Sequence, residues 1–298
     1  MRQLGVAVTQ MACSENRAEN IRRACALVEE AASRGAQVVI LQELFETPYF
    51  CIDVDPAWRG EATTVEANPA IAAIRPLAAR LDVVVPVSFY ERAGDGRLFN
   101  SLAVIDAGGD ILGVYRKSHI PDFPAYEEAF YFAPGDTGFR VWETKHVRLG
   151  CGVCWDQWFP EAARIMALAG AELLAYPTAI GRPLKSRAVQ PADSRPHWQR
   201  TMQGHAAANQ IPLAASNRIG VETGKDDVTQ FYGASFVCDP TGDKLVELDE
   251  TAPGVGVTTV DLDAAAALRR LWGVYRTRRT DLYGPIETQA PPEYLRAR

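Results

Sequence analysis

Hydrophobic residues repeat with two different periods along the N-terminal part of the chain. Over residues 16–34 the apolar side chains recur every three or four positions, which predicts a helix with one buried face, capped by Asn16. A second helix is predicted for residues 67–81. Three short apolar runs have the form of strands: residues 4–9, 37–41 and 83–89. The resulting order β-α-β-α-β predicts helices packed on a largely parallel sheet.

Hairpins dominate the pattern after residue 100. Strands over 101–106 and 111–117 flank an Ala-Gly-Gly-Asp turn, and strands over 231–239 and 244–248 flank a turn led by Pro240. The remaining predicted elements are strands over 173–176, 212–216 and 256–261 and helices over 197–209 and 262–270. Many strands mixed with amphipathic helices predict an α/β fold with two sheets face to face and helices outside.

One stretch, Leu149 to Glu161, combines a strand end with a helix start. Residues 147–149 begin a β-type run, residues 162–169 have helix-forming composition, and Pro160 suits a first helical turn. Cys154 is therefore expected just before a helix N-terminus, where free N–H groups and the helix dipole favour an anion. The sequence predicts a thiol there with a lowered pKa, which would make Cys154 a nucleophile.

Cys151 and Cys154 together allow two other interpretations, a redox dithiol or half of a zinc site. The zinc site is disfavoured because there is no second paired cluster of ligands and the four histidines are far apart in sequence. The redox interpretation stays open, although the strand-like Gly152-Val153 between the two cysteines is unlike thioredoxin-type motifs. The other four cysteines, at 13, 25, 51 and 238, are interpreted as small buried hydrophobes.

Composition narrows the class of protein. The chain has 298 residues, 47% of them hydrophobic, and no linker or low-complexity run divides it, which predicts one domain over 1–298. No apolar run approaches the ~20 residues of a membrane span, and the N-terminus leads straight into a strand rather than a signal peptide. Free cysteines then favour a cytoplasmic protein. A net charge of −6 argues against a general nucleic-acid binder.

A thiolate that attacks a carbonyl carbon needs a base, donors for the developing oxyanion and an acid for the leaving amine. Glu43 directly follows the buried strand 37–41, and Lys117 ends the strand 111–117. Together with Cys154, these residues lie at carboxyl ends of strands, where sites in open α/β sheets gather. Spacing in sequence leaves open whether the three meet in space.

The segments around these three residues resemble the Glu, Lys and Cys motifs of the nitrilase superfamily. They read LQELF at 41–45, YRKSHIPD at 115–122 and GVCWDQWFPE at 152–161, in the family's order and at its approximate spacing. Further matching stretches are FYFAPGDTGF at 130–139, YPTAIG at 176–181, ASNRIG at 215–220 and WGVYR at 272–276. The resemblance covers nearly the whole chain, and within the superfamily it points to the branch of N-carbamoylputrescine amidohydrolases.

The resemblance implies a four-layer αββα sandwich and hydrolysis of a linear C–N bond without cofactor or metal. Cys154 would be the nucleophile and Glu43 the base, while Lys117 would stabilise the oxyanion with the backbone N–H of Trp155. Glu128, six residues before the Pro-Gly-Asp of its loop, would position the base, the lysine and the substrate. Cys151 becomes a packed strand residue. The residues expected to bind substrate are Tyr49, Asp122, Trp155 and Asn217.

One segment departs from that branch. Where similar members continue after YPTAIG with Ser-Glu-Pro, near the far amine of the substrate, residues 181–187 read GRPLKSR and are basic. A primary ammonium would be repelled there unless Asp122, Glu127 or Asp193 compensates. An N-carbamoyl amino acid hydrolase is therefore an alternative, because Arg182, Lys185 and Arg187 could meet a carboxylate, as is an aliphatic amidase.

The function expected from the sequence is hydrolysis of N-carbamoylputrescine to putrescine, ammonia and carbon dioxide, a step of polyamine biosynthesis. The partners expected are a small-molecule substrate and further copies of the chain in a homo-oligomer, with no nucleic acid or membrane. Two segments are expected in subunit contacts, the region of the helix after Cys154 and the C-terminal tail 272–298. An inactive scaffold with the same fold is a further alternative, beside the redox protein.

Overall fold

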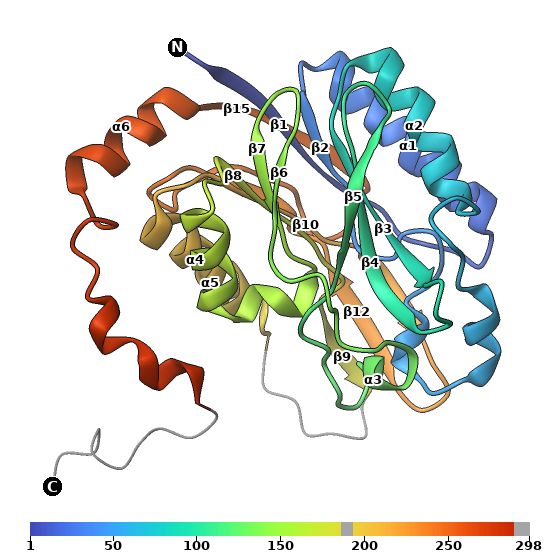
Figure 1. Ribbon diagram of the computed structural model, residues 1–298. Coiled ribbons are helices and arrows are strands. Elements are labelled where there is room, and N and C mark those ends of the chain that lie inside the picture. Colours follow the sequence, from blue (N-terminus) through green and yellow to red (C-terminus); the bar gives the residue numbers. More distant parts are fainter. Residues whose placement is uncertain (186–192, 289–298) are drawn as a thin grey trace, which may run out of the picture.

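Two β-sheets lie face to face at the centre of the molecule (Figure 1). The computed structural model describes residues 1–185 and 193–288. The first sheet has the strand order β15-β1-β2 and continues into β3-β4-β5, where Val84 pairs with Val38. Its strands are β15 (Gly254–Asp261), β1 (Gln3–Gln10), β2 (Val38–Ile40), β3 (Val85–Arg92), β4 (Leu98–Ile105) and β5 (Ile111–Arg116).

The second sheet has the order β14-β13-β10-β8-β7-β6. Its central strands β10, β8 and β7 are parallel, and antiparallel strands flank them on both sides. The strands are β14 (Lys244–Glu247), β13 (Phe236–Cys238), β10 (Leu213–Ser216), β8 (Leu173–Pro177), β7 (Arg148–Cys151) and β6 (Val141–Glu143). Like the first sheet, it therefore combines parallel and antiparallel pairing.

Helices cover the outer face of each sheet (Figure 1). α1 (Arg17–Ser33) and α2 (Pro69–Leu81) pack on the first sheet, with Val28 and Ile74 in one apolar cluster with Val39. α4 (Pro160–Leu168) and α5 (Arg195–Asn209) pack on the second, with Met166 and Met202 beside Leu174. A separate core fills the space between the sheets. The expected four-layer αββα arrangement is confirmed.

Helix starts follow the sequence closely, because polar caps define them. The side chain of Asn16 accepts a hydrogen bond from the N–H of Glu19 at the start of α1, and Asn68 caps α2 through Ile71 N–H. The expected strand 231–239 is wrong. It is split into β12 (Val228–Tyr232) and β13, because Gly233 and Ala234 both have positive φ, near +50°. β12 instead joins β11 (Ile219–Thr223) and β9 (Gly181–Lys185) in a small third sheet.

The C-terminal segment extends away from the sandwich (Figure 1). After β15 it forms α6 (Leu262–Trp272) and two short 3₁₀ helices, η4 (Thr280–Leu282) and η5 (Gly284–Glu287). Leu271 and Trp272 are 80% and 68% exposed. Residues 289–298 of the expected tail lie outside the described residues. Within the described ranges, no helix is both long enough and apolar enough to cross a membrane.

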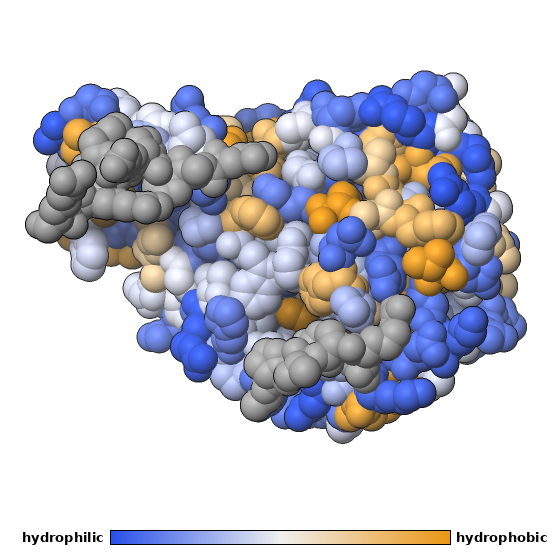
Figure 2. Space-filling view, turned by 90° about the horizontal axis from the view of Figure 1, so that it is seen from below, coloured by the Kyte–Doolittle hydropathy of each residue, from blue (hydrophilic) through white to orange (hydrophobic). Residues whose placement is uncertain are grey.

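The end of the molecule that carries α3 (Glu128–Tyr131) and β9 faces the viewer in Figure 2. Hydrophobic residues on this face occur in small groups among hydrophilic ones.

Candidate active site

Cys154 lies in a tight turn after β7. It begins a 3₁₀ helix, η3 (Cys154–Trp158), and has a φ of 41°, which is strained for a residue with a side chain. Gly152 is needed before it, because a Cβ there would lie 2.7 Å from the ring of Tyr176. The Cys154 thiol is buried, and its Sγ lies 3.8 Å from the carbonyl oxygen of Ala179, beyond the end of β8.

The helix expected with Pro160 in its first turn is present, but Cys154 does not lie directly before it. α4 starts only at Pro160, and the 3₁₀ turn η3 separates it from the thiol. A helix dipole acts mainly within its first turn, so α4 does little for Cys154. Burial raises the pKa of the Cys154 thiol well above its ordinary value; the Glu43 carboxylate raises it further, and Lys117 opposes this. The expected lowered pKa is therefore wrong, and the thiol needs a base to remove its proton.

Glu43, Lys117 and Glu128 meet in one buried cluster, although they come from three distant segments. The Lys117 ammonium is 3.0 Å from Oε1 of Glu43 and 2.6 Å from Oε2 of Glu128, and all three side chains are inaccessible to solvent. Burial by itself lowers the pKa of Lys117, but the Glu128 and Glu43 carboxylates outweigh it and raise that pKa. The lysine is therefore held as a cation. The charges of all three act on the thiol of Cys154.

The Glu43 carboxylate is held by one oxygen and free at the other. Oε1 accepts hydrogen bonds from the ammonium of Lys117 and, at 2.6 Å, from Nδ2 of Asn100 on β4. Oε2 is buried and has no hydrogen-bond partner among the described residues. A buried carboxylate oxygen without a donor is an energetic cost unless it serves in the reaction. This oxygen can accept a proton.

Backbone contacts fix the segment that follows Glu43. The N–H of Glu43 donates to the carbonyl of Thr178 beyond the end of β8. The buried Arg218 donates through Nη2 to the carbonyls of Glu43, Leu44 and Thr47, at 2.8–3.2 Å. The base is thereby tied to both sheets.

Glu128 opens α3, and its second oxygen accepts a 2.5 Å hydrogen bond from the hydroxyl of Tyr49. Burial raises the pKa of Glu128 to about 7, and Glu43 adds to this effect while Lys117 opposes it. Tyr49 is buried, and its hydroxyl is occupied by the hydrogen bond to Glu128.

The other residues expected to bind substrate occupy different places. Trp155 is partly exposed, and its ring lies against that of Phe123. Asp122, which precedes Phe123 in the sequence, is exposed. The N–H of Trp155 is among the first of its turn, which have no partner within a helix. Asn217 is wholly buried, and its amide is hydrogen-bonded to main-chain atoms of Ile180, Gly233 and Arg218. It has no group left for a substrate and instead fixes the chain after β8.

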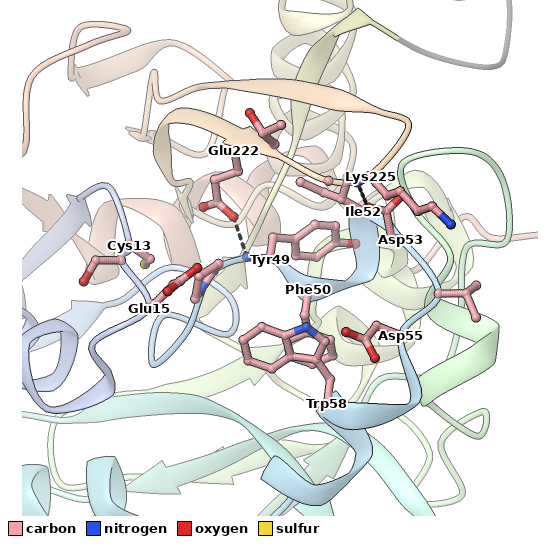
Figure 3. A pocket seen from close by; sticks show the side chains of 15 residues that line it. Cys13, Glu15, Tyr49, Phe50, Ile52, Asp53, Asp55, Trp58, Glu222 and Lys225 are labelled. Atoms are coloured by element: carbon pink, nitrogen blue, oxygen red, sulfur yellow. Dashed lines mark hydrogen bonds between the residues drawn. The ribbon is translucent and has the colours of Figure 1, made fainter.

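A cavity of about 640 Å³ lies beside Tyr49 (Figure 3). Its wall includes the aromatic rings of Phe50 and Trp58 and several carboxylates. Neither Cys154 nor any of the three buried charged residues lines it. The N–H of Tyr49 donates to Glu222 at this cavity, while its hydroxyl reaches Glu128. Tyr49 is therefore part of the wall between the cavity and the buried cluster.

Cys151 is packed in the core between the sheets, and all six cysteines are free thiols. Among the described residues, no group of three or more Cys, His, Asp or Glu is arranged to hold a metal ion. A Cys-Glu-Lys cluster with a second glutamate is consistent with covalent hydrolysis of an amide. Residues 5–270 match the sequence profile of the carbon-nitrogen hydrolases.

The chain belongs to the carbon-nitrogen hydrolase family.

Relatives within this family share almost the whole length of the chain. N-carbamoylputrescine amidase of Arabidopsis thaliana is 50% identical over 292 residues, which are 96% of each chain. A citrullinase of Francisella tularensis is 45% identical over 96% of this chain and 99% of its own. A crystal structure of a carbon-nitrogen hydrolase from Helicobacter pylori superposes with a TM-score of 0.89 at 38% identity, covering 96% of this chain and 99% of that one.

Sequence reasoning missed the residues that orient this carbon-nitrogen hydrolase cluster. Asn100 lies in an otherwise hydrophobic strand, where the polar pair Asn100-Ser101 was the available signal. Arg218 belongs to a matching segment, yet nothing in the sequence shows that its guanidinium would turn inward to bond three carbonyls.

Replacing each cysteine of the pair should separate hydrolysis from redox chemistry. Cys154→Ala should abolish amide hydrolysis, because Cys154 is the thiol expected to act as nucleophile, whereas Cys51, which the same charges also reach, is packed in an apolar cluster. Cys151→Ala should retain most of the rate, with some loss of thermal stability from its place in the core. Ammonia release measures the first effect. Equal loss in both variants, with a reversible Cys151–Cys154 disulfide, would support the redox alternative instead.

Alkylation tests the role of Glu43 without any substrate. Iodoacetamide should modify Cys154 at least about tenfold more slowly in Glu43→Gln than in the wild type, because the free oxygen is replaced by a group that cannot take the proton. Mass spectrometry of the labelled peptide follows the rate. Glu91→Gln is the control, since its buried carboxylate bonds Arg116 and Ser101 instead. Labelling unchanged in Glu43→Gln would remove Glu43 from the role of base.

Proposed function

We propose that this carbon-nitrogen hydrolase cleaves the carbamoyl group of an N-carbamoyl amine, with N-carbamoylputrescine as its substrate and putrescine, ammonia and carbon dioxide as products. The observation that carries the proposal is the buried Glu43, held at one oxygen and free at the other, next to a cationic Lys117 and a protonated Cys154. The 50% identity to the Arabidopsis enzyme of that name supports the choice of substrate.

The chemistry follows from the protonation states. Glu43 takes the thiol proton as the sulfur of Cys154 attacks the carbonyl carbon of the ureido group. Lys117 and the N–H of Trp155 stabilise the negative oxygen that forms. Glu43 then returns the proton to the departing nitrogen, which leaves a carbamoyl thioester on Cys154. Water, deprotonated by Glu43, releases the carbamate, and its breakdown completes the products.

Glu128 holds the lysine in this scheme. Its carboxylate is nearer to the Lys117 ammonium than that of Glu43, at 2.6 Å against 3.0 Å. Tyr49 fixes the other oxygen of Glu128. This role keeps Lys117 aimed at the reacting carbonyl while Glu43 gains and loses its proton.

Contacts of Arg182 weaken the objection that the basic loop would repel a diamine. Arg182 lies three residues after Ala179, whose carbonyl contacts Cys154, but its guanidinium is paired at 2.7 Å with Glu250. Glu250 also binds Arg195, and Asp193 lies within 4.0 Å of both arginines. Two arginines and two carboxylates have no net charge. Ser186 and Arg187, the end of the basic segment, lie outside the described residues.

The far end of the substrate separates the two functions suggested by the relatives. Putrescine ends in an ammonium, whereas citrulline carries a carboxylate beside its amine. The charge of Arg182 is balanced by its carboxylate partners. We therefore assign the exposed carboxylate of Asp122, next to Phe123, to binding the ammonium of the substrate. This favours the N-carbamoyl diamine over an N-carbamoyl amino acid.

A panel of substrates tests the proposed function. Ammonia release from N-carbamoylputrescine should be at least about a hundredfold faster, as kcat/KM, than from citrulline, N-carbamoyl-β-alanine or a simple aliphatic amide. Faster release from citrulline would end the putrescine assignment and leave the family chemistry in place.

A second variant tests the charge argument within the same panel. Glu250→Gln should free Arg182 and lower the preference for N-carbamoylputrescine over citrulline about tenfold or more, because an unpaired cation then acts on the far end. Glu247→Gln, a nearby carboxylate that pairs with Lys244, is the matched control and should leave the ratio unchanged.

We also propose that the chain forms one domain and assembles as a homo-oligomer in the cytoplasm. Both sheets share one core, which supports the single domain. Six free cysteines support a reducing compartment. The exposed Leu271 and Trp272 of α6 support a contact with a second copy through the C-terminal segment.

The assembly can be tested through α6. Trp272→Glu should lower the mass measured by light scattering toward that of a single chain, since it places a charge in the proposed contact. Thr280→Glu is a control from the same segment. A wild-type protein that is already monomeric would contradict this part of the proposal.

A further inference from the structure

Another buried carboxylate, that of Asp156, belongs to the 3₁₀ turn that Cys154 begins. Its side chain is wholly buried and accepts four hydrogen bonds. Oδ2 accepts from the N–H of Val153 at 3.0 Å and from the hydroxyl of Tyr115 at 2.7 Å. Oδ1 accepts from the N–H of His119 at 3.0 Å and contacts its Nδ1 at 2.8 Å. Every donor belongs to a residue one or two positions from Cys154 or Lys117 in the sequence.

These contacts connect the nucleophile to the cation. Val153 precedes Cys154, whereas Tyr115 and His119 stand on either side of Lys117, two residues away in each direction. One carboxylate therefore joins the start of the Cys154 turn to the end of β5. Because Cys154 has a strained positive φ, its turn needs such restraint.

His119 completes this arrangement from the surface side. Its ring stacks on Phe159 at 3.6 Å between centroids, with 6° between the planes, and its side chain is 30% exposed. An ionised Asp156 accepts hydrogen bonds only, so Nδ1 of His119 carries the proton that it donates. Among the described residues, neither His119 nor Asp156 is hydrogen-bonded to the side chains of the buried cluster, Glu43, Lys117 and Glu128.

We propose that the His119–Asp156 pair is a positioning device for the hydrolysis: the imidazole N–H orients the Asp156 carboxylate, which holds the Cys154 sulfur in line with the Lys117 ammonium. Neither group exchanges a proton with the substrate. The effect belongs to the addition step, where a small displacement of the sulfur from the carbonyl carbon lowers the rate. The proposal rests on the proposed covalent function, because it concerns the same thiol.

Two substitutions of His119 separate the hydrogen bond from the stacked ring. His119→Asn places an amide N–H near the position of Nδ1 and loses the ring, while His119→Phe keeps a ring on Phe159 and loses the donor. We expect His119→Phe to lower kcat ten- to a hundredfold with KM changed less than threefold, and His119→Asn to recover at least a third of the wild-type kcat. Thermal unfolding of both variants establishes that they are folded.

Alkylation of Cys154 by iodoacetamide gives a second measurement that needs no substrate. The rate should fall in His119→Phe and be near the wild-type rate in His119→Asn. Alkylation separates the positioning role of His119–Asp156 from the proposed hydrolysis of N-carbamoyl amines. A wild-type protein that releases no ammonia from ureido compounds would contradict the proposed hydrolysis, yet the alkylation rates of the variants would still test the positioning role. Wild-type behaviour of His119→Phe, equal losses in both variants, or a change in KM alone would overturn the positioning role.

Discussion

A lysine ammonium without access to water is the constraint around which this molecule is arranged. A buried cation is costly unless opposite charges surround it, and Lys117 has two carboxylates within 3.0 Å. Burial raises the pKa of both the Cys154 thiol and Glu128; the Glu43 carboxylate adds to each rise and the Lys117 ammonium opposes it. In the proposed mechanism, Cys154 therefore loses its proton to Glu43 during the reaction, and a resting thiolate is not required.

The four-layer sandwich meets this constraint by bringing ends of strands from both sheets together. Lys117 follows β5 and Glu43 follows β2 in the first sheet, whereas Cys154 follows β7 in the second. Main-chain bonds between the sheets, such as Glu43 N–H to Thr178 carbonyl, hold the halves in register. Within the cluster, Asn100 and Lys117 donate hydrogen bonds to one carboxylate oxygen of Glu43, and the other oxygen has no partner among the described residues. Among the described residues, Oδ1 of Asn100 and Nε of Arg218 are also buried without a partner, and the proposed mechanism uses the free Glu43 oxygen as the proton acceptor.

The proposed function assigns bond cleavage and substrate choice to separate parts of the structure. In it, the buried cluster acts on the carbonyl common to all amide and ureido substrates. The proposed charge balance at the far end of the substrate depends on four ion-paired residues of β9, the start of α5 and the loops before α5 and β15: Arg182, Arg195, Asp193 and Glu250. An amidase and a citrullinase at similar identity to this chain agree with that separation.

The sequence by itself determined the local features of this protein. Asn16 and Asn68 mark helix starts because capping needs only neighbouring residues, and Glu43, Lys117 and Cys154 could be placed at strand ends from short motifs. Tertiary structure decided the rest. Asn217, expected at the substrate, is used up by main-chain bonds, and the strand expected over 231–239 divides between two sheets. The Cys154 pKa rises where a falling one was expected, because desolvation and neighbouring carboxylates depend on which distant segments fold around a residue.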